Sequence, residues 1–179
     1  SILIRPGEGK NVLIDGGPDK TVLYKLEKYL PWYDRTIDAM ILTHPHADHV
    51  NGLVPILDRM KVKAVLLAGS EYESEAYAAF LKKISDKKIP VYIADDGRDF
   101  KLGETTVDVL FPFENIGETD NVNNASIVMK ITNGEDSILL SGDAEIEEES
   151  QLLGLDLDAD ILKAGHHGSR TSSTTEFLS

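Results

Sequence analysis

The sequence contains no cysteine, which excludes a disulfide scaffold, a thiolate metal site and a cysteine nucleophile. This absence leaves the compartment open, because proteins without disulfides occur on both sides of a membrane. No apolar run approaches the ~20 residues that a transmembrane helix needs, so we expect no stable membrane insertion of this segment. Basic residues are scarce, since 18 Lys and Arg stand against 31 Asp and Glu, for a formal net charge of −13. This balance argues against tight, backbone-wide binding of nucleic acid, which needs clusters of Lys and Arg.

The composition that remains is globular, with 41% apolar and 27% charged residues in a chain of 179. A chain of this length and composition can bury a full hydrophobic core, so we expect one domain over residues 1–179. Periodicity and turn signals predict strands at 1–5, 11–14, 37–43, 62–67, 91–94, 105–111, 126–131, 137–140 and 159–164. They predict helices at 19–30, 49–60, 74–84 and 144–153, with no closing element in the polar tail 169–179.

In each half of the chain strands are followed by helices, which predicts a layered α/β (α+β) fold, an αββα sandwich with two sheets face to face. All five histidines fall in two short clusters, each directly after a predicted strand: His44, His46 and His49, then His166 and His167. Lone histidines are usually satisfied polar groups, but clustering of the whole supply at two strand ends favours a ligand site. The alternative is a polar turn with unbound histidines.

The spacing in the first cluster is typical of a metal site. His44 and His46 lie two apart on an extended segment, so both imidazoles point to one side. Asp48 and His49 follow as the chain turns into a helix and can face the same cavity. Four nitrogen and oxygen donors without a thiolate suit zinc, and also manganese or iron.

Two aspartates at strand ends each have two interpretations. Asp143 directly follows the strand 137–140, where it is either a helix N-cap or a bridging metal ligand. Asp15, in Asp15-Gly16-Gly17, either caps a turn or holds a ligand histidine by its second ring nitrogen.

These residues, in this order, resemble the metallo-β-lactamase superfamily, and the His44-x-His46-x-Asp48-His49 element is very specific. The motifs extend across essentially the whole chain. Three stretches resemble the branch that holds the extracytoplasmic domain of ComEC-type competence proteins and its stand-alone relatives: 123–128, 141–145 and 162–169. Ser1 resembles the end of a Gly-Gln-Gly-Asp-Ser stretch typical of that branch, so the resemblance implies a chain trimmed at both ends. It also implies a part of a larger membrane protein, extracytoplasmic if the protein is of the ComEC type and otherwise cytoplasmic or secreted.

The resemblance implies two divalent metal ions, with zinc favoured and manganese or iron also compatible. One metal would lie on His44 and His46, the other on Asp48, His49 and His167, and Asp143 would bridge them. His166 would then contact the substrate, although the two neighbouring histidines could exchange roles.

The sequence departs from many superfamily members, because no histidine occurs between residues 50 and 165. The segment Asn121–Asn124 lies where that ligand is expected. The first site is therefore expected to be weak, completed by water, or helped by one of these asparagines or by Asp120.

Such a pair of metals, ~4 Å apart, activates a bridging hydroxide for attack on a phosphoryl or acyl centre. Asp48 or Asp143 would orient it, and His166 would stabilise charge or protonate the leaving group. The leading hypothesis is a phosphodiesterase or nuclease, with DNA as the substrate of the branch. The alternatives are a hydrolase of a small ester, lactone, thioester or phosphocholine-type substrate, and a non-catalytic metal-binding interaction domain. The oligomeric state does not follow from the sequence.

Overall fold

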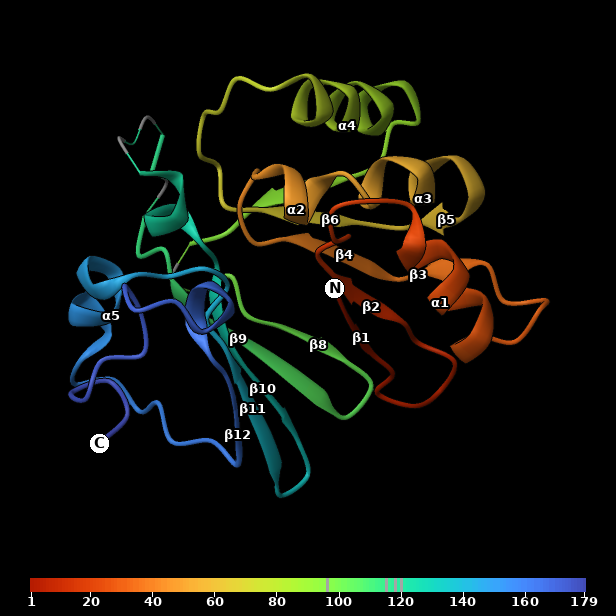
Figure 1. Cartoon of the computed structure of the whole chain (residues 1–179). Coiled ribbons are helices and arrows are strands. Elements are labelled where there is room, and N and C mark those ends of the chain that lie inside the picture. Colours follow the sequence, from red (N-terminus) through yellow and green to blue (C-terminus); the bar gives the residue numbers. More distant parts are fainter. Residues whose placement is uncertain (96, 115, 118, 120) are drawn as a thin grey trace.

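The computed structural model describes residues 1–95, 97–114, 116–117, 119 and 121–179. Two five-stranded sheets lie face to face and helices cover their outer sides (Figure 1). The predicted αββα sandwich is therefore confirmed. Among the described residues, no helix combines the length and the apolar character that crossing a membrane requires.

The first sheet has the order β1-β2-β4-β6-β7, in which β1 is antiparallel to β2 and the other neighbours are parallel. Parallel strands place their carboxyl ends at one edge, where ligands bind in layered α/β folds. A separate pair, β3 and β5, runs parallel beside it. The bounds of these strands are β1 Ile2–Ile4, β2 Val12–Ile14, β3 Thr36–Ile37, β4 Ala39–Leu42, β5 Lys61–Val62, β6 Val65–Leu67 and β7 Val91–Ile93.

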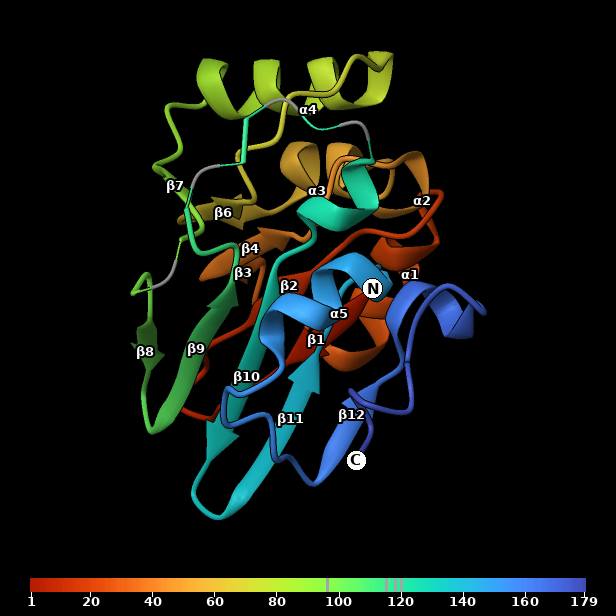
Figure 2. The ribbon, with the colours of Figure 1, turned by 90° about the vertical axis from the view of Figure 1, so that its left-hand side faces the viewer.

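The second sheet has the order β12-β11-β10-β9-β8, which Figure 2 shows across the width of the molecule. Its strands are antiparallel except for β11 and β12, which are parallel. The hairpin predicted at Asn133-Gly134 joins β10 to β11. The bounds are β8 Phe100–Leu102, β9 Thr105–Phe111, β10 Val128–Asn133, β11 Asp136–Leu140 and β12 Ile161–Lys163.

Helices α1, α3 and α4 pack on the first sheet, and α5 packs on the second (Figures 1 and 2). Short elements lie at the sheet edge that carries the site. The bounds are α1 Thr21–Tyr29, α2 Ala47–Val50, α3 Leu53–Arg59, α4 Glu75–Asp86 and α5 Ile146–Leu152, with 3₁₀ turns η1 Val122–Ala125 and η2 Gly165–Gly168.

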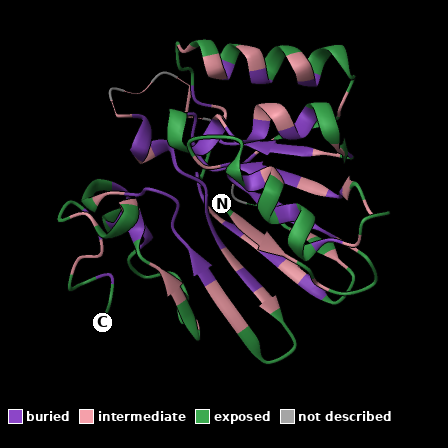
Figure 3. Ribbon diagram, turned by 45° about the vertical axis from the view of Figure 1, so that its right-hand side comes forward, coloured by how far each residue is buried: buried purple, intermediate pink, exposed green. Residues whose placement is uncertain are grey.

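Alternation along the buried strands builds the three cores of the sandwich. In β4, Met40 and Leu42 pack under the helices of the first sheet, whereas Ile41 packs between the sheets. Successive side chains of a strand point to opposite faces, so an apolar run is needed where both faces are covered. A third core lies between the second sheet and α5. Figure 3 shows the buried residues gathered in the strands and on the inner helix faces.

Three predicted elements are divided in the structure. The run 37–43 is split at Asp38, which is buried and accepts hydrogen bonds from the backbone N–H of Asn11 and from Lys63. The run 62–67 likewise forms β5 and β6. The helix predicted at 49–60 is divided at Gly52, whose N–H donates to the carbonyl of Gly17.

Two features were not predicted. β8 forms the edge of the second sheet by pairing with β9 across the turn at Gly103. The tail 169–179 forms no helix or strand, as expected, yet it closes the third core because Phe177 is buried there. Glu149 of α5 holds the tail by accepting hydrogen bonds from the N–H groups of Ser173 and Thr174.

Candidate metal centre

The two histidine clusters meet at one edge of the sandwich. His49 follows β4 in the first sheet and His167 follows β12 in the second, and their ring centroids are 5.5 Å apart. Asp15 follows β2 and Asp143 follows β11, so both aspartates reach the same edge. The expectation that strand ends bring these segments together is thereby met.

Four side chains come close enough to share an ion. Ligand atoms of Asp48, His49, Asp143 and His167 all lie within 4.8 Å of one another. The Oδ2 of Asp143 is central, at 3.2 Å from His49 Nε2 and 3.3 Å from His167 Nε2. The latter nitrogen also lies 3.2 Å from Asp48 Oδ2. Two carboxylates and two imidazoles form a donor set that suits a divalent metal.

His44 and His46 lie beside this group. The Nε2 of His44 is 3.2 Å from His46 Nδ1 and 3.9 Å from Asp143 Oδ2. His44 is fully buried, whereas His46 is partly exposed and meets the ring of Tyr72 edge-on at 5.4 Å. His44 thus approaches the same Asp143 oxygen as His49 and His167, and His46 adjoins this group through His44.

Asp15 holds His49 from behind. Its Oδ2 lies 2.8 Å from His49 Nδ1, so the second ring nitrogen is engaged and Nε2 is directed at Asp143. The same carboxylate accepts hydrogen bonds from the backbone N–H and the hydroxyl of Thr43. Gly16, next to Asp15, packs directly against the backbone at Gly52, where a Cβ on residue 16 would overlap that backbone. The side-chain contacts of Asp15 thus go to His49 and Thr43, as the interpretation that it holds a ligand histidine requires.

His166 turns away from the donor group. Its Nδ1 lies 2.9 Å from Glu145 Oε1, and its ring centroid is 6.3 Å from that of His167. His166 and His167 both have positive φ, at 41° and 53°, a left-handed conformation that few non-glycine residues adopt. Such local strain persists where the surrounding structure enforces it and concentrates at functional sites.

The asparagine segment contacts acids instead of histidines. The amides of Asn121 and Asn123 donate to Glu145, and that of Asn124 donates to Glu147. These contacts give the segment a role in holding Glu145, and the ligand role considered for its asparagines stays a prediction. Asp120, the other candidate in this segment, lies outside the described residues.

Burial and neighbouring charges set the protonation of the site. Burial, together with the nearby His49, lowers the pKa of His44 to about 3, so this imidazole is neutral at pH 7. Burial alone would also lower the pKa of His49, but contacts with Asp143 and Asp15 outweigh it and raise the pKa to about 9. Burial opposes ionisation of Asp143, yet His49 and the other histidines hold its pKa below the usual range. Without an ion, a protonated His49 balances the aspartates.

Sequence reasoning missed several supporting groups. Ser126 accepts a hydrogen bond from the N–H of Asp143 and lies 3.4 Å from His44 Nδ1, which ties the two sheets together. Gly142 leaves room for the Ser126 side chain, because a Cβ on residue 142 would lie 2.7 Å from it. The φ of Gly142 is 55°, which also favours glycine. Glu145 could have been suspected from its position two residues after Asp143. No sequence pattern points to Ser126, which is 17 residues before Asp143.

The residues fit the metal that the site chemistry calls for. Within the described part of the chain, two buried polar atoms of the site, His49 Nε2 and Asp143 Oδ1, make no contact with full hydrogen-bond geometry, although His49 Nε2 lies 3.2 Å from Asp143 Oδ2. Buried polar atoms are normally paired, so both atoms are available to an ion. His49 lines a cavity of about 230 Å³ together with Asp48, His167 and Lys163.

The chain matches the model of the metallo-beta-lactamase superfamily over residues 1–179 and belongs to this superfamily. Its members are generally hydrolytic metalloenzymes whose fold binds divalent metals. The crystal structure of metallo-beta-lactamase SMB-1 bound to 2-mercaptoethanesulfonate superposes with a TM-score of 0.59 over 98% of this chain and 82% of that one. At 14% identity this likeness concerns the fold alone.

Two curated relatives support the narrower resemblance. ComE operon protein 3 of Bacillus subtilis (strain 168) is 28% identical over 146 residues, which cover 80% of this chain and 19% of that protein. Recombination protein 2 of Haemophilus influenzae is 29% identical over 175 residues, or 95% of this chain and 20% of that protein. Both are competence-related ComEC-type proteins. The chain spans about a fifth of their length.

Proposed function

We propose that this site hydrolyses phosphodiester bonds and that its substrate is DNA. The observation that carries the proposal is the group formed by Asp48, His49, Asp143 and His167, whose ligand atoms lie within 4.8 Å of one another. Three of the four, Asp48, His49 and His167, line a cavity. The names of the ComEC-type relatives, competence and recombination proteins, support a nucleic acid as the substrate.

Six residues would hold two divalent metals, with zinc favoured and manganese or iron as alternatives. His44 and His46 would hold one, Asp48, His49 and His167 the other, and Asp143 would bridge them. When bound, such metals supply a nucleophilic water at neutral pH and a counter-charge for a phosphoryl oxygen. The metal on His44 and His46 would have fewer protein donors than the other metal and would bind more weakly.

The chain's own residues would position and protonate the substrate. Glu145 holds His166 through Nδ1, which leaves Nε2 to donate a proton to the leaving oxygen. Burial alone would raise the pKa of Glu145, but hydrogen bonds from Thr171, Asn121 and Asn123 outweigh it and lower the pKa. Glu145 therefore stays ionised and keeps the orientation of His166 fixed.

Lys163 would attract the phosphate. Its Nζ donates to the carbonyl of Gly142 at 2.6 Å and lies 3.7 Å from Asp143 Oδ1. This tether holds a positive charge at the cavity that Asp48 and His167 line. A fixed cation beside the reacting group stabilises negative charge that develops on a phosphoryl oxygen.

The test measures metal content and turnover together. Purified protein loaded with zinc or manganese should hydrolyse bis(p-nitrophenyl) phosphate and a fluorescent single-stranded oligonucleotide. Asp143→Asn should lower both rates more than ~100-fold, beyond the range seen for outer-shell partners of a metal. Asp136→Asn, an exposed aspartate at the start of β11, is the matched control and should leave them unchanged. Turnover of lactones or thioesters without phosphodiester turnover would refute the proposal in favour of a small-ester hydrolase.

A further inference from the structure

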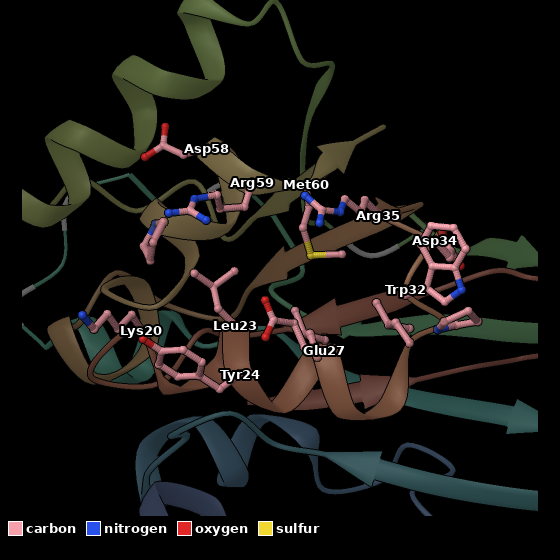
Figure 4. A pocket seen from close by; sticks show the side chains of 14 residues that line it. Lys20, Leu23, Tyr24, Glu27, Trp32, Asp34, Arg35, Asp58, Arg59 and Met60 are labelled. Carbon is pink, nitrogen blue, oxygen red and sulfur yellow. The ribbon is translucent and has the colours of Figure 1, made fainter.

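A groove of about 580 Å³ lies outside the metal centre, between α1 and the end of α3 (Figure 4). Lys20, Leu23, Tyr24 and Glu27 of the α1 segment form one wall, and Asp58, Arg59 and Met60 form the other. The loop with Trp32 and Arg35 forms the end of the groove away from Lys20.

The groove lies in the part of the chain that does not share the overall acidity. Residues 1–63 contain nine Lys and Arg and eight Asp and Glu, whereas residues 64–179 contain nine and 23. The net charge of −13 is thus carried by the second part of the chain. A polyanion that is repelled elsewhere can approach this face, because exposed charges act over only ~8 Å at physiological salt.

Free cations outnumber free acids within the groove. Among the residues that the structure describes, the side chains of Lys20, Arg35 and Arg59 make no ion pair or hydrogen bond. Two of the acids that line it are engaged: Asp58 pairs with Lys83 at 2.6 Å, and Asp34 accepts from Asn11 Nδ2 at 2.9 Å. Glu27 is the remaining acid of the lining, so the surplus of available charge is positive.

Exposed aromatic rings line or flank the same groove. Trp32 is 87% exposed, and Tyr33 packs edge-on against it with ring centroids 5.7 Å apart. Tyr24 is 60% exposed on the wall formed by α1. Exposed rings beside free cations are the features on which unpaired bases stack while their phosphates are neutralised. Duplex bases are already stacked, so this combination selects single strands.

The groove is also connected to the metal centre. Asp15 and Lys20 are separated by a four-residue loop. That loop is fastened to α2 and Gly52, because Gly16 N–H donates to the carbonyl of His49 and Gly52 N–H donates to that of Gly17. The end of the groove at Lys20 is therefore joined by a short, hydrogen-bonded loop to Asp15, which contacts His49. The nine residues of α1 extend the groove by ~13 Å, the length of a few nucleotides.

We infer that this groove binds single-stranded nucleic acid and guides it toward the metal centre. Trp32, Tyr33 and Tyr24 stack on bases, while Lys20, Arg35 and Arg59 bind phosphates. The inference deepens the proposed function. Cleavage of the guided strand rests on the proposed hydrolysis, whereas binding in the groove does not require cleavage.

Trp32 is the single tryptophan of the chain, so intrinsic tryptophan fluorescence reports on this groove alone. Metal-free protein in EDTA is titrated with oligo(dT) of 12 nucleotides at low salt. Saturable quenching is expected, because bases stack on the exposed indole, and the apparent Kd should rise with salt. A 12-base-pair duplex should quench far less. Unchanged tryptophan emission would overturn the inference and leave the groove as a protein-binding surface.

Variants separate the groove from general charge effects, with binding read from the anisotropy of a labelled oligonucleotide. Lys20→Gln with Arg59→Gln should lower the salt slope by about 1.4, since each phosphate contact on a single strand contributes about 0.7. Trp32→Ala should weaken binding about 5- to 150-fold, the range for loss of one stacked base. The matched control, Lys87→Gln with Lys101→Gln, removes two exposed charges outside the groove and should change neither quantity. Equal effects of the two double variants would contradict the inference.

The failures of the two proposals can be distinguished. Oligo(dT) quenching without turnover of bis(p-nitrophenyl) phosphate would refute the proposed hydrolysis and support the groove. Turnover of that small substrate without quenching would do the opposite. If both proposals hold, Lys20→Gln with Arg59→Gln lowers the ratio of oligonucleotide to small-substrate turnover.

Discussion

The neighbours His166 and His167 differ in what they contact, and their truncation should separate a metal ligand from a substrate-facing group. His167 Nε2 lies 3.2 Å from Asp48 Oδ2 and 3.3 Å from Asp143 Oδ2, whereas His166 Nδ1 contacts Glu145. The side chain of His166 is 32% exposed and that of His167 is 57% exposed. Exposed ion pairs contribute little, so His166→Ala and His167→Ala should melt within a few degrees of the parent in EDTA.

Added metal should then separate the two variants. An ion that binds only the native state stabilises it by about 2.7 kcal/mol at 100 times the Kd. For a chain of this size about 1 kcal/mol shifts the Tm by 2–4 °C, so the parent should gain about 5–11 °C. His167→Ala removes one of four donors, and a 100-fold loss of affinity leaves about 0.4 kcal/mol, or ~1 °C. His166→Ala should keep nearly the whole shift and lose ~10²-fold in rate.

The measurement is thermal unfolding with and without zinc or manganese, combined with elemental analysis of the dialysed protein. Reversed results, in which His166→Ala loses the metal and His167→Ala keeps it, would show that the two histidines have exchanged roles. Identical shifts in all three proteins would refute the donor group itself, because the ion would then bind elsewhere.

Two further predictions concern the groups around the site. Asp15→Asn should lower metal affinity ~10- to 100-fold, because His49 loses the carboxylate at Nδ1. Competition with a chromophoric chelator measures this affinity, and the control Asp136→Asn should leave it unchanged. Equal metal affinities of Asp15→Asn and the parent would contradict the role of Asp15 in holding His49. Burial raises the pKa of Glu148 in the folded protein well above the ordinary 4.5. As pH rises above 4.5, Glu148 ionises in the unfolded chain but stays protonated in the folded one, so the protein loses stability. Glu148→Gln should therefore gain stability over the parent from pH 5 to 8 in urea unfolding, by at most about 1.4 kcal/mol per pH unit, whereas the exposed Glu147→Gln should not. Parallel pH profiles of Glu148→Gln and the parent would refute this assignment.

The position of the candidate metal centre could be predicted from sequence because it depends on local order along the chain. A polar cluster directly after a buried parallel strand must lie at the edge where such strands end, as His44 and His167 do. The hairpin at Asn133-Gly134 is equally local, since the turn determines the pairing of its flanking strands. Strands covered on both faces of the sheet need apolar residues at successive positions, so they could be recognised in the sequence as apolar stretches.

The features that sequence reasoning missed depend on contacts between distant residues. Asp38 divides a strand-like run because it is hydrogen-bonded to Asn11, 27 residues away. The asparagines at 121, 123 and 124 could equally have faced His44, and only the packing of α5 directs them to Glu145 and Glu147. The tail lacks any periodic pattern, yet Phe177 fills the third core because Glu149 anchors the preceding backbone.

Net charge misleads about partners when charge is unevenly distributed. Five of the 31 acids, Asp15, Asp38, Asp143, Glu148 and Glu149, are buried. Those that remain exposed lie mainly after residue 63 and are screened beyond ~8 Å at physiological salt. On the proposed path, a strand at Trp32 would therefore respond to Arg35 and Arg59, whose side chains have no ion-pair partner among the described residues. The same acidity that argues against wrapping a duplex around the whole molecule is compatible with a narrow single-strand path along α1. Salt should weaken binding on that path and should ease approach to every other face.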